Sequence, residues 1–472
     1  MPIEHLLPEL VLALGAVAVI LVAAFVGQPR QWLCAPLAFA VVATSSAAAL
    51  WLHGRSGIPV LTAHGTWAID AIMGWSRAVI LLTGAVVILL SPRWFVSDRR
   101  HGEWYGLLLL STLGATLLAG ASDLSLLMVA VLLSSVTGYT MASYHRASRI
   151  CAEAGAKFYF LGAIANPVLF LGLVFVYGVA GTTGYGAIAG ELVSRDLGGV
   201  ALSAGFGMIL VGLTFKLGAV PVHAWVPDVA QGSPAPAAAF ITVAPKVGAL
   251  LALARIASLL PDAAVAWRAA IAVIALATMT LGNLAALWQQ DVRRLIGWSS
   301  VSQVGYGLLA VVALGRSPLA LSSLALFMAA YALANLTAFA VVVSLRGRTK
   351  LDDYKGLGRV RPAHAAALTV AFLSLAGVPP LVGFTAKLAL FAAVMESGYT
   401  WLALAAVANT VISLFYYLRV IGAMFLVAPL GNAALLGREA LGVCVIGAMT
   451  LVLVGIMTQS VIAALEGSPL LP

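Results

Sequence analysis

Apolar stretches of about 20 residues, long enough to cross a bilayer as helices, follow one another through nearly the whole chain. In the hydrocarbon core, backbone N–H and C=O groups must be paired within the protein, which leaves helices and closed barrels as the spanning structures. Since 62% of the 472 residues are hydrophobic and only 9% are charged, a soluble core does not account for this composition. The sequence therefore predicts an all-α polytopic membrane protein in a lipid bilayer.

About fourteen spans can be placed with this length as the ruler. They form an N-terminal three-helix segment at 1–100, two groups of five helices at 101–258 and 259–427, and a C-terminal segment at 428–472 that holds the last helix. The predicted bounds are 8–27, 32–52, 72–92, 104–121, 123–143, 157–180, 200–220, 236–257, 264–288, 293–313, 318–345, 364–396, 401–426 and 440–465.

The distribution of arginine and lysine predicts the orientation of these spans. Loops after odd-numbered spans carry most of the basic residues, as at 93–100, 146–157 and 346–361, whereas the other loops hold single arginines. By the positive-inside rule the odd-numbered loops are cytoplasmic. We therefore expect a multi-pass protein of the bacterial plasma (inner) membrane with both termini on the periplasmic side. The net charge of +9 is then a topology signal, and no nucleic-acid partner is predicted.

The sequence contains no motif for chemistry of its own. Cys34, Cys151 and Cys444 lie far apart, which argues against a metal site or a disulfide framework. Glycine-rich phosphate loops, CxxC pairs and catalytic-triad spacings are absent from the sequence. We therefore predict no catalytic residue, no metal and no bound cofactor, and expect any redox chemistry to occur in a partner.

The stretch 215–250 combines two features that are costly inside a membrane. It carries Lys216 and Lys246, and lysine at bilayer depth is rare and usually functional. It also carries the helix-breaking prolines Pro221 and Pro245, and freed backbone groups are tolerated there only against protein or trapped water. Because burial disfavours the charged ammonium, such lysines can exchange protons, and the pattern indicates an ion path.

Three further positions bear on this path. Lys387 follows the Pro379-Pro380 pair in the twelfth span, and His223 follows the break in the seventh. A histidine can relay protons near neutral pH, and a structural hydrogen-bonding role for His223 is the alternative. For Lys216, which lies near the end of its span, snorkelling to the headgroups is the alternative. None of the seventeen Asp and Glu residues falls at the middle of a span, so these lysines lack a carboxylate partner in the membrane core.

Short sequence echoes suggest that the two groups of five helices are repeats. TLG at 112–114 returns at 280–282, with an aspartate nine residues after each glycine. LGAVP ending at Pro221 returns as LAGVPP ending at Pro380. Five helices is an odd number, so the second copy enters the membrane from the opposite side, and inverted repeats with broken helices are typical of transporters. Chance similarity in an Ala/Leu/Gly-rich sequence is the alternative.

These stretches resemble subunit N of respiratory complex I, the proton-pumping NADH:quinone oxidoreductase, and more broadly its antiporter-like family. The resemblance covers the chain almost end to end. It rests on FKLGAVPVHAWVPDVAQGSPAPAAAFITVAPK at 215–246, LGNLAALWQQDVRRLIGWSSVSQVGYGLL at 281–309, LAGVPPLVGFTAKLALF at 375–391, WLALAAVANTVISLFYYLRV at 401–420, LLPELVLALG at 6–15 and KFYFLGAIANPVLFLGLVFVYGVAGT at 157–182.

The resemblance implies a role for each lysine. Lys216 corresponds to the charge-modulating lysine of the seventh helix, Lys246 to the central relay lysine, and Lys387 to the distal lysine near the exit side. The chain would be a non-catalytic membrane subunit of a proton-translocating enzyme, beside other membrane-arm subunits. NADH, FMN, iron–sulfur clusters and quinone would be bound by partner subunits.

Three positions depart from the family pattern, and each loses a titratable group. Leu132 stands where the family has a glutamate paired with the lysine of the seventh helix. Gln231 replaces a glutamate after the PDV motif, and Gln303 replaces a histidine that many members carry. These losses motivate two alternatives to a pumping complex I subunit. One is a structural paralogue with impaired pumping, and the other is a subunit of a cation/proton antiporter or membrane-bound hydrogenase complex.

Overall fold

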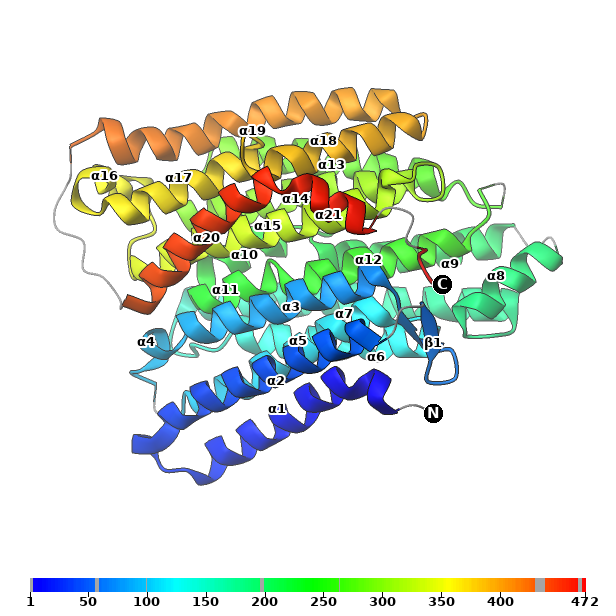
Figure 1. The fold of residues 1–472 in the computed structure, drawn as a ribbon, viewed down its shortest axis with the longest axis horizontal. Coiled ribbons are helices and arrows are strands. Elements are labelled where there is room, and N and C mark those ends of the chain that lie inside the picture. Colours follow the sequence, from blue (N-terminus) through cyan, green and yellow to red (C-terminus); the bar gives the residue numbers. More distant parts are fainter. Residues whose placement is uncertain are drawn as a thin grey trace.

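Helices that run roughly parallel to one another build the whole molecule (Figure 1). The computed structural model describes residues 3–55, 59–98, 100–195, 199–262, 264–428, 438–465 and 469–472. Its helices and strands are α1 (Leu7–Phe25), α2 (Cys34–Arg55), β1 (Val60–Thr62), β2 (Trp67–Ile69), α3 (Ala71–Leu90), α4 (Pro92–Phe95), α5 (Gly102–Gly120), α6 (Leu124–Ala142), α7 (Arg149–Ala180), α8 (Tyr185–Ser194), α9 (Val200–Leu217), α10 (Trp225–Gly232), α11 (Ala235–Ile241), α12 (Ala244–Leu259), α13 (Trp267–Leu287), α14 (Val292–Ala313), α15 (Leu319–Ser344), α16 (Leu357–Val360), α17 (Pro362–Ala376), α18 (Val382–Glu396), α19 (Thr400–Leu426), α20 (Arg438–Ile456) and α21 (Thr458–Leu465).

The prediction of an all-α membrane protein is confirmed. Within the described residues, eleven helices are long and apolar enough to cross a membrane, and α17 and most of α20 form shorter apolar helices. Each of the fourteen predicted spans coincides with a helix or with two consecutive helices. Three of them, at 236–257, 364–396 and 440–465, are interrupted, as α11/α12, α17/α18 and α20/α21. The count of fourteen crossings itself stays a prediction.

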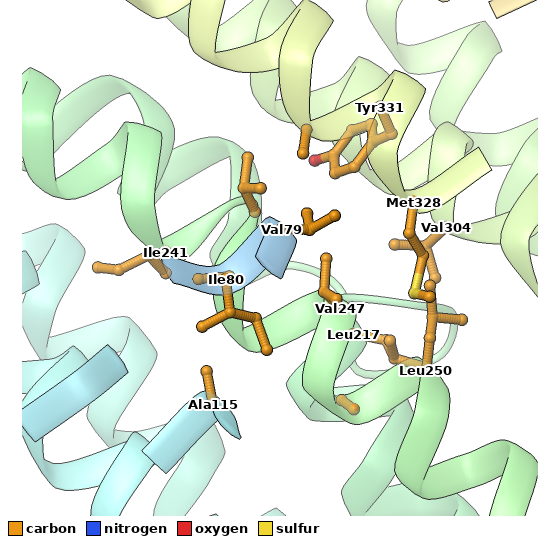
Figure 2. Close-up of a cluster of buried hydrophobic side chains, with 14 of the residues drawn as sticks. Val79, Ile80, Ala115, Leu217, Ile241, Val247, Leu250, Val304, Met328 and Tyr331 are labelled. Atoms are coloured by element: carbon orange, nitrogen blue, oxygen red, sulfur yellow. The ribbon is translucent and has the colours of Figure 1, made fainter. Parts of the chain in front are cut away.

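Small residues bring the central helices close together. Helices in a membrane gain little from hydrophobic association, so close packing across small side chains holds them. A Cβ on Gly248 of α12 would lie 2.4 Å from the carbonyl oxygen of Ala115 in α5, so only glycine fits there. Around this contact, apolar side chains of α3, α5, α12, α14 and α15 meet, among them Ile80, Val247 and Met328 (Figure 2).

The two proline-marked breaks have the same local geometry. Helix α9 ends at Gly218 (φ +70°) and α17 ends at Gly377 (φ +85°), left-handed conformations that glycine adopts readily. A cis peptide bond precedes Pro221 in the first break and Pro380 in the second. The first break thus ends α9 before the short helix α10, and the second divides the predicted span 364–396 into α17 and α18.

Close contacts of a glycine with the next helix occur in two matching places, between α5 and α6 and between α13 and α14. A Cβ on Gly114 would lie 2.8 Å from the backbone nitrogen of Ser134, and one on Gly282 would lie 2.6 Å from that of Ser302. Asp123 caps the N-terminus of α6, and an aspartate at the equivalent place, Asp291, caps α14. The two aspartates that follow the repeated TLG sequence thus both cap the N-terminus of the next helix.

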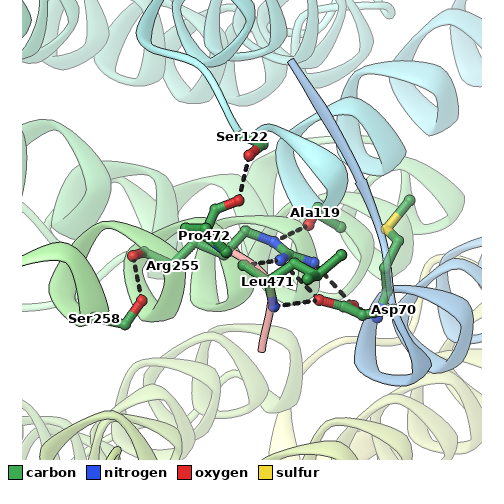
Figure 3. A network of polar contacts seen from close by, with 8 residues as sticks. Asp70, Ala119, Ser122, Arg255, Ser258, Leu471 and Pro472 are labelled. Carbon is green, nitrogen blue, oxygen red and sulfur yellow. Dashed lines mark hydrogen bonds and ion pairs between the residues drawn. The ribbon is translucent and has the colours of Figure 1, made fainter. Parts of the chain in front are cut away.

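Two buried ion pairs fasten α3 to its neighbours. Glu9 of α1 pairs with Arg77 at 2.9 Å. Asp70, which caps α3, receives two hydrogen bonds from the Arg255 guanidinium of α12, at 2.8 and 3.0 Å, and both side chains are fully buried. Leu471 closes this cluster, because its N–H donates to Asp70 and its carbonyl oxygen accepts from Arg255 (Figure 3). Both termini lie at this end of the bundle (Figure 1).

The substitution Asp70→Asn tests how much the buried pair of Asp70 and Arg255 contributes to the free energy of unfolding. Asparagine keeps the helix cap but leaves the Arg255 charge uncompensated, so we expect a loss of about 3–5 kcal/mol in the free energy of unfolding. The measurement is thermal unfolding of the purified protein in detergent. Asp262→Asn is the matched control, because Asp262 pairs with Arg268 and Arg316 near the surface and should contribute about 1 kcal/mol or less. Equal shifts in both variants would contradict the assignment.

Candidate functional site

Lys216 lies in the last turn of α9, beside the first break, and its side chain is buried. Its ammonium donates to the Ser134 hydroxyl of α6 at 3.1 Å. The carbonyl end of a helix dipole favours a cation at this position. Because the side chain is only 3% exposed, it does not reach the protein surface, and the snorkelling alternative is wrong for this residue.

Leu132 does not face Lys216, which corrects the expectation taken from the family pattern. Its side chain is 41% exposed on the outer face of α6. Successive residues of an α-helix are rotated by about 100°, so Leu132 and Ser134 point in nearly opposite directions. Ser134 is the residue that contacts the ammonium. A carboxylate at position 132 would therefore lie on the surface of this subunit and not beside the lysine.

Lys246 lies in the first turn of α12, immediately after Pro245, and is 1% exposed. Its ammonium donates to the Ser300 hydroxyl at 2.5 Å and to the Ser300 carbonyl oxygen at 3.2 Å. The Ser300 hydroxyl lies 2.7 Å from that of Tyr331, which in turn donates to the carbonyl oxygen of Thr242 at 2.6 Å. Thr242 lies in the gap between α11 and α12, so the interrupted helix supplies the free acceptor at the end of this chain.

Lys387 lies in α18 and is 3% exposed. Its ammonium donates at 2.8 Å to the carbonyl oxygen of Leu375, one of the last residues of α17. Those carbonyls have no partner within their own helix, and the dipole of α17 favours a cation there. The ammonium also lies 4.1 Å from the centre of the Tyr306 ring. The second break thus supplies the carbonyl partner of Lys387, whereas the partner of Lys216 is a hydroxyl of the neighbouring helix α6.

Gln303 connects the surroundings of Lys246 and Lys387. Its amide donates to the same Leu375 carbonyl oxygen, at 2.9 Å, that accepts from Lys387. A small cavity of about 10 Å³ is lined by Lys246, Gln303 and Tyr331, and a neighbouring one, also of about 10 Å³, is lined by Gln303, Tyr331 and Lys387. The position that departs from the family histidine therefore holds a polar side chain between the two lysines.

His223 and Gln231 lie apart from this cluster. The His223 ring packs against Trp298, 5.6 Å between centroids, and its Nδ1 has no hydrogen-bond partner in the part of the chain that is described. Gln231 accepts a hydrogen bond from Arg294 at 3.1 Å, beside the Asp228 carboxylate. The structure thus brings Lys246 and Lys387 together through Gln303 and places His223 outside their hydrogen bonds.

The hydroxyl and amide partners of the lysines are the functional residues that sequence reasoning missed. They are Ser134, Ser300, Tyr331 and the amide neighbour Asn335, whose Nδ2 donates to Tyr331 at 2.8 Å. Serine and tyrosine are common in membrane helices, so composition does not mark them. A signal exists for the two serines, because each belongs to a serine pair inside a membrane helix, Ser134-Ser135 in α6 and Ser299-Ser300 in α14.

We predict that Leu132→Glu leaves proton transport unchanged, because the new carboxylate points away from Lys216. Ser134→Asp places a carboxylate against the ammonium and should reduce transport, since a close ion pair holds the lysine in its charged state. Both variants can be compared by proton-to-electron stoichiometry in proteoliposomes. Restored or enhanced transport in Leu132→Glu alone would show that position 132 does reach the lysine.

Comparison with known proteins is consistent with this arrangement. The profile of the family described as NADH:quinone oxidoreductase/Mrp antiporter, TM matches residues 121–413. NADH-quinone oxidoreductase subunit N 1 of Streptomyces griseus is 42% identical over 98% of both chains. A chain of respiratory complex I from Thermus thermophilus with bound aureothin is 29% identical, with a TM-score of 0.83 over 97% of this chain and 98% of that one.

The fold is also shared with a more distant assembly. A chain of the Mrp complex from Dietzia sp. superposes with a TM-score of 0.86 over 98% of this chain and 97% of that chain, at 22% identity. At that identity the likeness concerns the fold alone. The helical bundle is therefore common to chains of respiratory complex I and of the Mrp complex.

Proposed function

The chain belongs to the NADH:quinone oxidoreductase/Mrp antiporter transmembrane family, and from this premise we propose that it is a membrane-arm subunit of a complex I-type NADH:quinone oxidoreductase. In this proposal it carries protons across the bacterial plasma membrane through Lys216, Lys246 and Lys387, with both termini on the periplasmic side. NADH, FMN, iron–sulfur clusters and quinone are bound by partner subunits, and the chain itself carries no redox site.

The observation that supports this proposal most is the set of neutral oxygens around each lysine. Hydroxyl and carbonyl oxygens of Ser134, Ser300 and Leu375 accept from the three ammonium groups, and no ion pair joins these lysines to a carboxylate among the described residues. A carboxylate partner would hold a lysine charged, whereas neutral oxygens tolerate both the ammonium and the amine. Each lysine can therefore gain and lose a proton during turnover.

The order of groups supports transfer from Lys246 to Lys387. The Lys246 ammonium donates a hydrogen bond to the Ser300 hydroxyl, which in turn contacts the hydroxyl of Tyr331. Tyr331 lines both small cavities, and the second of these reaches Lys387. Gln303, between the cavities, cannot titrate, so in this proposal it orients donors and acceptors while hydroxyl groups and water move the proton.

We further propose that α5–α12 and α13–α19 are inverted repeats. The matched breaks after Gly218 and Gly377 and the matched caps Asp123 and Asp291 support this division. In transporters built this way, the ion site lies near the membrane midplane at the broken helices. Lys216 and Lys387 stand beside the two breaks, as that architecture predicts.

The structural-paralogue alternative rests on the losses at Leu132, Gln231 and Gln303. It is not favoured, because Leu132 points away from Lys216 and Gln303 keeps a hydrogen-bonding role between two lysines. A chain of an Mrp complex shares the fold, but the full-length relatedness to subunit N favours complex I over the antiporter and hydrogenase alternatives. Subunits retained after purification in mild detergent distinguish them, since an NADH- or quinone-reducing module is expected.

Lys246→Ala and Lys387→Ala test the relay itself. Without an amine at either place the path is interrupted, so we expect proton translocation to fall by a factor of about 10² or more in the assembled complex, as for loss of a positioned proton-transfer group. The measurement is the proton-to-electron ratio in proteoliposomes. Lys157→Ala is the control, because Lys157 is a surface residue paired with Glu153 and Asp228. Normal pumping by both relay variants would refute the proposal.

Gln303 is tested by restoring the family residue. Gln303→Leu removes the hydrogen bond to the Leu375 carbonyl at similar size and should slow translocation about tenfold, the equivalent of one net hydrogen bond. Gln303→His should retain the wild-type rate and make it more pH-dependent near neutrality, because imidazole titrates there. A wild-type rate and pH profile in Gln303→Leu would exclude Gln303 from the path.

A further inference from the structure

A polar group beside Lys216 remains unexplained by the relay described above. Asn166 of α7 is 6% exposed, and its Nδ2 donates to the Ser135 hydroxyl at 3.1 Å and to the Tyr139 hydroxyl at 3.3 Å. Its Oδ1 has no hydrogen-bond partner among the described residues. Turning the amide around would leave the nitrogen unpaired instead. A buried amide with one idle polar atom is costly in free energy unless a water completes it.

The hydrogen bonds of Asn166 lead toward the serine pair that holds Lys216 on one side and toward an opening to solvent on the other. On one side, Ser135 adjoins Ser134, which accepts from the Lys216 ammonium. On the other side, Tyr139 lines an open cavity of about 1340 Å³ together with Asp98, Tyr159 and other residues of the α4–α5 loop, α6 and α7. In Figure 1, α4 lies at the end of the bundle opposite to the two termini, the end that the arginine count predicts to be cytoplasmic.

The backbone of α7 is shaped to receive the tyrosine. A Cβ on Gly162 would lie 1.7 Å from the Tyr139 hydroxyl oxygen, so any larger residue would displace that hydroxyl. Gly162 precedes Asn166 by four residues, and both therefore face the same side of the helix. The glycine holds the tyrosine hydroxyl within reach of the asparagine.

The second half of the chain contains the same device. Asn335 of α15 is 1% exposed, donates through Nδ2 to the Tyr331 hydroxyl at 2.8 Å, and has no partner for its Oδ1 in the described structure. There Tyr331 connects through Ser300 to Lys246. A buried asparagine with an unpaired Oδ1 thus donates to a tyrosine hydroxyl in both places; around Lys246 the contacts continue to the lysine, and in the first half they reach Ser135, the neighbour of the Lys216 partner Ser134.

We propose that Asn166 holds a water molecule beside Lys216 and, with Tyr139, connects this lysine to the open cavity, so that protons enter the first half of the subunit by this route. The inference deepens the proposed function and rests on it for the direction of proton flow. Asn166 is a positioning residue, since an amide holds water but does not itself carry the proton. Hydroxyl groups and water make the connection that a carboxylate makes elsewhere in the family.

Tyr139→Phe is the decisive variant, because it removes one oxygen atom at a partly exposed position. In the assembled complex in proteoliposomes we expect proton translocation to fall about tenfold, the equivalent of one hydrogen bond. Tyr159→Phe is the matched control, since Tyr159 lines the same cavity but its side chain is 53% exposed. Equal rates for the two variants would overturn the proposed entry route.

Asn166 and Gly162 provide independent variants. Asn166→Leu should reduce translocation to a similar degree, whereas Asn166→Ser, which can still hold a water, should recover most of it. Gly162→Ala should act like Tyr139→Phe, because its methyl group displaces the tyrosine hydroxyl. Gly178→Ala on the same helix is the control, since a Cβ there meets nothing within 4 Å. Failure of the serine to rescue would assign Asn166 a packing role and contradict the inference.

A labelling experiment separates this inference from the proposed function. Asn166→Cys should react with a water-soluble methanethiosulfonate added on the cavity side, because a thiol needs water to ionise, whereas Ala165→Cys, buried one residue away, should not. Absence of labelling at 166 would overturn the entry route even if Lys246→Ala abolishes pumping. Labelling at 166 with normal pumping in Lys246→Ala would keep the route and refute the proton relay.

Discussion

An ammonium group in the interior of a membrane must be solvated by the protein that surrounds it, and this requirement organises the fold. Lys216, Lys246 and Lys387 are each adjacent to a place where a helix stops. Helix ends supply backbone carbonyls without partners, and nearby hydroxyl groups complete the shell. At Lys387 the break is therefore part of the site, because it frees the Leu375 carbonyl oxygen that a continuous helix would consume in its own hydrogen bonds.

The positions of the apolar spans, of the proline-marked breaks and of the lysines could be predicted from the sequence, because hydropathy, proline and isolated charge are properties of single segments. It was insufficient for contacts between segments. The pairing of Asp70 with Arg255 joins residues 185 positions apart, and both lie near span ends where a charge is unremarkable. The direction of Leu132 depends on which face of α6 meets α9, and an aligned position carries no information about that face.

The two halves of the chain solve one problem with different residues. In the first, Lys216 contacts Ser134, and the route proposed above runs through Asn166 and Tyr139 to the open cavity. In the second, the polar groups lead from Tyr331 past two small cavities to Lys387. In this proposal the first half connects its lysine to an open cavity, and the second half connects two buried lysines to each other.

The buried clamp between Asp70 and Arg255 has a mechanical consequence for α12. It pins that helix near its outer end, and Lys246 lies nine residues away, about 13 Å along the axis. The opposite end is joined to α11 only through Thr242 and Val243. A shift of α12 along its axis would break this buried pair, so the clamp sets the axial position at which Lys246 meets Ser300.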